Sequence, residues 1–382
     1  MRGNLLFSFM VLMTLAPAMR MYGNFQTWNF NYRVSVLDNF IFSIGVLFAS
    51  IDVFLMSERF ESVVNLTKSK FKLETIDLDS DFLQDKINLV KNITEDVSKN
   101  TLYLIYVMLF FFTSFSLIPL SGFIFYLLQL KSAENLSRPF SLHSYFNVPS
   151  FIPEFVENLV LTSIELFGIY YTMAVTTNIH ALQSLSINIL IGDMKLFQLN
   201  VEEVDECFEQ ILKSEKYEDA PALARKTMEN KLRLATRNLV IHHIKIFRKV
   251  EQLNYGSNFR IFYVNCYMCL QIVFGISIFL KGELINKIKY GFMTITIVIV
   301  EYFFSQNGQL LQNEGEQLKM ALYDSRWIGK PRWFIRALQI LMLRSNKLPK
   351  VGLLNIFTLN RNNMTEVIRG AYSYFNLLNK FS

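Results

Sequence analysis

The sequence predicts an all-α integral membrane protein with seven spanning helices, an inside N-terminus and a helical cytoplasmic anchor layer. Three observations predict this fold. Charged residues make up only 18% of the 382 residues and apolar residues 52%, whereas an ordinary soluble domain carries roughly 25% charged residues. The apolar residues gather in long runs, each near the roughly 20 residues that a helix needs to cross a bilayer. Lys and Arg, finally, concentrate in alternate connections between these runs.

Each of the seven runs is long, apolar and flanked by more polar connections. In chain order they are Leu5–Tyr22, Val36–Met56, Leu102–Leu128, Phe155–Asn178, Phe259–Leu280, Tyr290–Ser305 and Val351–Leu378. The first run lacks a small-residue cleavage site before a polar start, so we expect a span rather than a signal peptide. Polar residues from Asn360 to Asn363 interrupt the last run. They predict two half-helices, or one helix with a polar break near its middle.

Two segments between the spans predict helices outside the bilayer. The run Pro331–Leu343 is apolar but too short to span, and Pro331 suits the first position of a helix. The stretch Val201–Asn254 carries apolar residues at helical spacing among many charges. Examples are Leu232, Leu239, Ile246 and Val250. We expect the spans to continue as helices that pack into a compact cytoplasmic layer; the alternative is a set of solvated, salt-bridged loops.

The basic residues predict the orientation of the chain in the membrane. The second, fourth and sixth connections hold most of the Lys and Arg residues, and the first, third and fifth hold few. The positive-inside rule therefore puts the even connections and the N-terminus in the cytoplasm. The glycosylation sequon Asn135-Leu136-Ser137 falls in the third connection, on the predicted outer side. Because the net charge of +6 is scattered over several loops, we expect a lipid bilayer and no nucleic acid as a partner.

Catalytic and metal-binding motifs are absent from the sequence. None of the four histidines belongs to a nucleophile or metal-ligand motif, and the three cysteines show neither a disulfide framework nor zinc spacing. We expect no enzyme, no cofactor and no metal. Three acidic residues, Asp52, Glu165 and Glu301, fall within or near spans, where a carboxylate faces a partner, a cavity or a pore. A buried pair, a water-facing end and a functional role stay open as explanations.

Aromatic residues and small hydroxyls recur in the outer halves of spans two, three, four and six. They predict an apolar ligand cavity with a few hydroxyl groups. The candidate lining residues are Phe40, Phe112, Phe115, Ser116, Tyr170, Tyr171, Met293 and Thr294. Plain contact with lipid or with neighbouring helices is the alternative for any single one of them. Micromolar affinity needs about 8 kcal/mol, which a small ligand reaches at roughly 0.8 kcal/mol per heavy atom.

Three motifs in the last third of the chain resemble those of insect odorant receptors. They are LKMALYDSRW (Leu318–Trp327), LRSNKLP (Leu343–Pro349) and VIRGAYSYFNLL (Val367–Leu378), with the core Tyr372-Ser373-Tyr374-Phe375. The resemblance implies an odorant-gated, non-selective cation channel in the plasma membrane of olfactory sensory neurons. It also implies a volatile odorant as ligand and a co-receptor subunit as partner, most often in a tetramer.

The resemblance further divides the chain and assigns pore residues. Spans one to six with their cytoplasmic extensions cover 1–330, an anchor helix covers 331–349, and a pore-lining seventh span covers 350–382. The implied pore and gate positions are Tyr374, Leu377 and Lys380, with Leu377 as the apolar gate. Lys380 departs from the pattern, since a lysine facing the lumen repels cations; the alternative is that it snorkels to the outer interface. The fourth connection is shorter than that of the co-receptor, which favours a tuning subunit.

Two other receptor classes compete with this interpretation. A gustatory-type chemoreceptor channel carries Gln-Phe after a Thr-Tyr pair in its last span, whereas this chain has Ser373-Tyr374 and no such Gln. A G-protein-coupled receptor places its N-terminus outside, opposite to the side that the Lys and Arg count predicts.

Overall fold

The computed structural model describes residues 30–69, 71, 80–127, 154–213, 222–281, 284–353 and 357–380. Within these ranges the chain is helical apart from short connections and one short pair of strands, which confirms the all-α prediction. The predicted first span Leu5–Tyr22 and the sequon at Asn135 lie outside the described residues.

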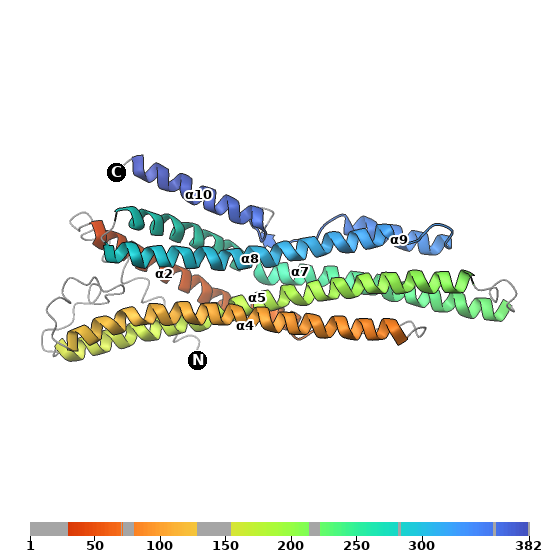
Figure 1. Ribbon diagram of the computed structural model, residues 1–382, viewed down its shortest axis with the longest axis horizontal. Helices are drawn as coiled ribbons and strands as arrows, with labels where there is room; N and C mark the ends of the chain where they lie inside the picture. The colour runs from red at the N-terminus through yellow and green to blue at the C-terminus, as the bar shows by residue number, and fades with distance from the viewer. Residues whose placement is uncertain are drawn as a thin grey trace.

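Long helices lie side by side along the long axis of the molecule (Figure 1). In chain order the elements are α2 (Phe30–Ser50), the π-helix η2 (Ile51–Leu55), α3 (Ser57–Thr67), α4 (Ser80–Leu127), α5 (Glu154–Lys213), α7 (Ala222–Lys281), α8 (Leu284–Asp324), α9 (Arg332–Ser345), β1 (Gly352–Leu353), β2 (Phe357–Thr358) and α10 (Arg361–Lys380). Helices α5 and α7 each have 60 residues, or about 90 Å at 1.5 Å per residue. That is about three times the thickness of a bilayer core, so the prediction that spans continue as long helices is confirmed.

The bundle divides along its length into two halves. The α9 half contains residues 80–100 of α4, 187–213 of α5, 222–254 of α7 and 306–324 of α8, together with α9. The α2 half contains α2 and the remaining parts of the four long helices, with α10 packed against α7 and α8. Figure 1 shows α9 and α10 toward opposite ends of α8. Helix α5 packs against α4, α7 and α8, and so forms the spine of both halves.

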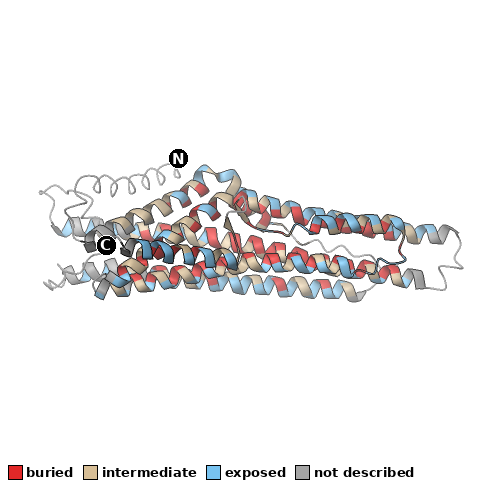
Figure 2. Cartoon of the chain, turned by 90° about the horizontal axis from the view of Figure 1, so that it is seen from above, coloured by how far each residue is buried: buried red, intermediate tan, exposed pale blue. Residues whose placement is uncertain are grey.

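The core runs along the inner faces of the long helices. Figure 2 shows buried residues on these faces and exposed residues on the outer ones. The four residues predicted at helical spacing in the fourth connection are all buried, namely Leu232, Leu239, Ile246 and Val250. Their burial confirms a packed helical layer in the described parts of this stretch, residues 201–213 and 222–254.

The segment before α10 corrects the predicted helix over Val351–Leu378. Residues 351–353 and 357–360 are not helical, and Gly352 and Leu353 pair antiparallel with Thr358 and Phe357. The Asn360 side-chain oxygen accepts a hydrogen bond of 2.8 Å from the backbone N–H of Asn363. Such a bond caps a helix N-terminus, so the polar residues begin α10 instead of breaking a longer helix.

The short helix within the sixth connection follows its prediction closely. Helix α9 runs from Arg332 to Ser345, and Pro331 is its N-cap, one position before the predicted one. Its inner residues Phe334, Leu338 and Leu341 are buried, while Ile340 and Leu343 are exposed on the opposite face.

Among the described residues, one helical stretch, Lys226–Leu280, is long and apolar enough to cross a membrane by length and composition, and Ser43–Leu55 is a shorter apolar helix. The count of seven spans and the inside N-terminus therefore stay predictions.

Candidate ligand cavity

A cavity of about 120 Å³ lies in the α2 half between α2, α4, α5, α7 and α8. Its volume is close to the roughly 150 Å³ of an apolar cavity that takes up benzene. The described lining residues are mostly apolar. They are Gly45, Val46, Ala49, Met108, Phe111, Phe112, Ile169, Thr172, Thr176, Ile179, His180, Tyr263, Val264, Tyr267, Met268, Met293, Thr296, Ile297 and Val300. This lining suits a small, largely apolar ligand.

Three polar residues of α5 line the cavity at a spacing of four. Thr172, Thr176 and His180 share one face of the helix. The Thr172 hydroxyl donates to the Gly168 carbonyl at 2.8 Å, and the Thr176 hydroxyl donates to the Thr172 carbonyl at 2.7 Å. Each hydroxyl proton is thus used within the helix, and only oxygen lone pairs remain for a ligand.

His180 is the last residue of the polar row of α5. It is 6% exposed, and its Nδ1 has no hydrogen-bond partner among the described residues. The imidazole packs edge-on against the ring of Phe304, with the ring centroids 4.2 Å apart. A buried polar nitrogen without a partner is costly, and the residue that carries it lines the cavity.

A buried ion pair lies one helical turn from the cavity wall. Arg260 Nε donates to Asp52 Oδ2 at 2.8 Å, and both side chains are fully enclosed. Asp52 lies in the π-helix η2, where the backbone N–H of Met56 bonds to the Ile51 carbonyl. Of the explanations for Asp52, the structure supports the buried pair. Glu301 is also buried, 3.4 Å from the Ser305 hydroxyl, and the side chain of Glu165 lies outside the described residues.

The predicted lining residues divide into those that reach the cavity and those that lie elsewhere. Phe112 and Met293 line it. Tyr170 is 71% exposed, and Phe40 is half-buried outside the lining.

Hydroxyl groups among the predicted residues bond to neighbouring helix atoms. Ser116 donates to the Phe112 carbonyl and Thr294 to the Tyr290 carbonyl, both at 2.8 Å. The Tyr171 hydroxyl lies 3.3 Å from the hydroxyl of Ser50. The side chain of Phe115 lies outside the described residues. The α5 row was not among the predicted lining residues. The spacing of four between Thr172, Thr176 and His180 places them on one helix face and could have indicated it.

Helix α10 presents one face to the bundle and leaves the other uncovered. Val367, Ala371 and Phe375 are buried, whereas Tyr374 and Leu377 are 60% and 50% exposed. The predicted gate residue thus lies on the outer face of the isolated chain. Lys380 ends α10, and its side chain lies outside the described residues.

Residues 26–372 match the sequence model of the family described as the 7tm Odorant receptor. The chain belongs to this odorant receptor family. Its fold is similar to two structures of the insect olfactory receptor OR5 from Machilis hrabei, one of them in complex with eugenol. Each match has a TM-score of 0.74 and 12% sequence identity, and covers 99% of this chain and 88% of the other. Among curated protein sequences, none matches significantly.

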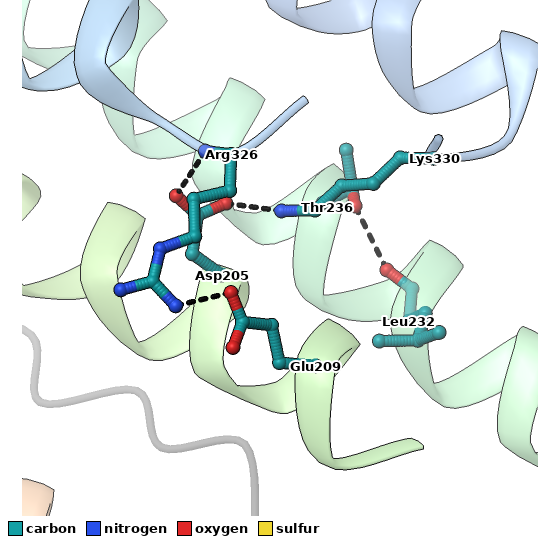
Figure 3. A network of polar contacts seen from close by, with 6 residues as sticks. All are labelled: Asp205, Glu209, Leu232, Thr236, Arg326 and Lys330. Atoms are coloured by element: carbon teal, nitrogen blue, oxygen red, sulfur yellow. Dashed lines mark hydrogen bonds and ion pairs between the residues drawn. The ribbon is translucent and has the colours of Figure 1, made fainter. Parts of the chain in front are cut away.

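In the α9 half of this odorant receptor, acidic residues of α5 pair with basic residues of other elements. Asp205 accepts hydrogen bonds from the backbone N–H of Arg326, at 2.9 Å, and from the Lys330 ammonium (Figure 3). The Arg326 guanidinium also bonds to Glu209. Lys330 lies over the ring of Phe208, 4.8 Å from its centroid. These contacts tie the end of α5 to the α8–α9 connection.

Two deeper ion pairs tie α5 to α4 and α7. The Lys86 ammonium lies 2.5 Å from Glu203, and Lys249 lies 2.6 Å from Asp193. Burial raises the pKa of Asp193, and the charge of Lys249 opposes that rise. The pairs therefore compensate charges that the packed layer removes from water.

Proposed function

We propose that this receptor is the ligand-binding tuning subunit of a heteromeric, odorant-gated, non-selective cation channel in olfactory sensory neurons. In this proposal it acts as a receptor and not as an enzyme. The odorant occupies the cavity between α2, α4, α5, α7 and α8, and a co-receptor subunit completes the channel, most often as a tetramer.

The observation that carries the proposal is the apolar cavity. Its walls come from helices that are far apart in sequence, and its lining combines aromatic side chains with three threonine hydroxyls. The related Machilis hrabei receptor was solved in complex with eugenol, which is a small aromatic compound. Family membership and a cavity of matching chemistry together favour a volatile odorant as the ligand.

The uncovered faces of α9 and α10 support assembly with other subunits. On α10, Ile368, Tyr372 and Leu377 are exposed, and on α9 Ile340 and Leu343 are exposed. Apolar faces of this kind mark contacts with other proteins or with lipid. We assign α10 to the pore, with Leu377 as the gate, and α9 to contacts between subunits. The sequence favours the same assignment for α10, since this helix carries the motif Val367–Leu378.

The proposal includes the threading of the chain through the plasma membrane. It has seven spans, a cytoplasmic N-terminus and the α9 half on the cytoplasmic side. The concentration of Lys and Arg in the even connections supports this orientation. An odorant that binds the open arrangement more tightly than the closed one then shifts the population toward the open channel.

Recording currents after co-expression with the co-receptor tests this function. We expect odorant-evoked cation currents from a panel of small volatile compounds, and none from cells that express the co-receptor alone with the same compounds. Leu377→Ala widens an apolar constriction, so we expect larger resting currents. Asn362→Ala, an exposed position at the start of α10, serves as the matched control.

Three results contradict parts of the proposal. The absence of any evoked current across a broad panel, with the receptor present at the cell surface, rules out a tuning subunit. Unchanged resting and evoked currents in Leu377→Ala rule out the gate. A tag on Met1 that is accessible from outside intact cells reverses the proposed threading.

A further inference from the structure

We propose that the cavity selects neutral ligands that carry a hydroxyl group, and that His180 is the residue that anchors this group. The inference rests on the proposed function, because it names the ligand class of the same cavity. It derives from the hydrogen-bonding state of the polar atoms in the lining.

The threonines of the cavity wall present acceptors only. Thr172, Thr176 and Thr296 each donate the hydroxyl proton to a carbonyl of their own helix, at 2.7 to 3.0 Å. Each oxygen keeps a lone pair that can accept a hydrogen bond from a ligand. A ligand with only acceptor groups, such as a ketone or an ester, gains nothing from these three residues.

His180 supplies the one lining side chain with a buried, unpartnered polar atom among the described residues. Its Nδ1 is an acceptor in one tautomer of the neutral imidazole and a donor in the other. A ligand hydroxyl both donates and accepts, and so pairs with Nδ1 in either tautomer. A ketone pairs with one tautomer only, and a hydrocarbon with neither.

The apolar lining sets the other limits on the ligand. A charged ammonium or carboxylate would lose most of its hydration in this mostly apolar cavity. That loss of hydration is prohibitively costly. The volume of about 120 Å³ fits a small ring or a short chain. The chemical class that satisfies all of these conditions is a small alcohol or phenol.

Probes of matched size test this selectivity directly. We would use 1-hexanol, 2-hexanone and heptane, which have equal numbers of non-hydrogen atoms, and the pair phenol and toluene. Binding is measured as the thermal stabilisation of the purified full-length receptor, since a ligand stabilises the state to which it binds. We expect 1-hexanol and phenol to bind about tenfold more tightly than their matched probes, the effect of one additional buried hydrogen bond.

Substitutions of His180 identify the anchoring atom. His180→Phe keeps the ring and removes the polar nitrogen, so the hydroxyl preference should fall below about twofold while toluene still binds. His180→Asn keeps a polar atom near the position of Nδ1 and should restore part of the preference, and it also serves if the phenylalanine variant does not fold. Asn362→Ala, at an exposed position of α10 outside the cavity lining, should leave the preference intact.

The outcomes separate this inference from the proposed function. Equal binding of alcohols and matched ketones, or a preference that survives in His180→Phe, overturns the role of His180. Failure of every probe to bind also overturns it. Odorant-evoked currents that show no hydroxyl preference refute the inference and leave the channel proposal standing. Selective binding without any evoked current refutes the channel proposal and leaves the role of His180 standing.

Discussion

The two halves of the molecule differ in how their polar groups are arranged. In the α9 half, charged side chains of α5 are paired with partners on α4, α7 and the α8–α9 connection. In the α2 half, the polar groups around the cavity are few, and at His180 one is left without a partner among the described residues. The comparison teaches that ion pairs between helices fix their arrangement, whereas an unpartnered polar atom beside a cavity leaves an energetic gain for a ligand.

Removing one partner of the Asp52–Arg260 pair should give the largest effect. Arg260→Ala leaves a buried carboxylate without its counter-ion, which costs about 3–5 kcal/mol. We expect little monodisperse receptor by size-exclusion chromatography of the solubilised protein. The double variant Asp52→Leu/Arg260→Met removes both charges and should recover much of the yield. If the single and double variants are equally unstable, the pair does not hold η2 against α7.

A matched pair of phenylalanines compares the packing of the two halves. Phe208 is completely buried in the α9 half, with its ring centroid 4.7 Å from that of Phe334, whereas Phe112 lines the cavity. We expect Phe208→Ala to lower the free energy of unfolding by about 3–5 kcal/mol. Phe112→Ala should cost less, because one side of its ring already faces empty space. Chemical denaturation of both purified variants measures the difference, and an equal cost contradicts the contrast between the halves.

The histidines of α7 make the stability of the α9 half depend on pH. Burial is the main cause that lowers the pKa of His243 to about 4 and of His242 to about 4. The His243 Nε2 lies 2.9 Å from the hydroxyl of Ser345. Because the unfolded imidazole binds a proton near pH 6.5 and the folded one near pH 4, stability is full above about pH 6.5 and falls as the pH drops toward 4.

At pH 5 the free energy of unfolding is lower by on the order of 2 kcal/mol for each of these histidines. Thermal unfolding of the purified receptor between pH 7 and pH 5 measures the loss. His243→Gln should remove about half of the pH dependence, and an unchanged slope would assign the effect to other groups.

A smaller effect is expected at the contact between α7 and the start of α10. The Asn363 side-chain amide donates to Asn265 Oδ1 at 2.7 Å, and Asn265 follows directly on Val264 of the cavity wall. Asn363→Ala leaves a buried acceptor unsatisfied, so we expect a destabilisation of about 1–2 kcal/mol. It should also shift the odorant concentration that gives a half-maximal current, because the cavity wall and α10 are then less firmly joined. Exposed Asn362→Ala should change neither quantity.

The sequence predicted most of the helices because helical periodicity and apolar run length are local properties. Leu232, Leu239, Ile246 and Val250 predicted a packed layer that the structure contains. The same local signals gave a wrong prediction for the start of Val351–Leu378. The apolar run there includes two short strands before the helix begins. The cap at Asn360 depends on a side-chain hydrogen bond, and hydropathy does not report that bond.

The cavity was harder to predict because it depends on the rotation of each helix about its own axis. Of two adjacent aromatic residues, Tyr170 points outward and Tyr171 reaches toward Ser50, and composition does not distinguish them. Phe112 and Met293 face the cavity. The row of Thr172, Thr176 and His180 continues past the predicted end of its span at Asn178. Because the lining was predicted from the outer halves of the spans, it did not include this histidine.

The link between Asp52 and Arg260 also constrains the order in which the receptor is made. The two residues are 208 positions apart, so the carboxylate leaves the ribosome long before the guanidinium that neutralises it. A buried charge without its partner is costly, so the packing of η2 against α7 cannot form until α7 has been synthesised. A nascent chain that stops short of α7 has a carboxylate at Asp52 without the counter-ion that it has in the complete chain.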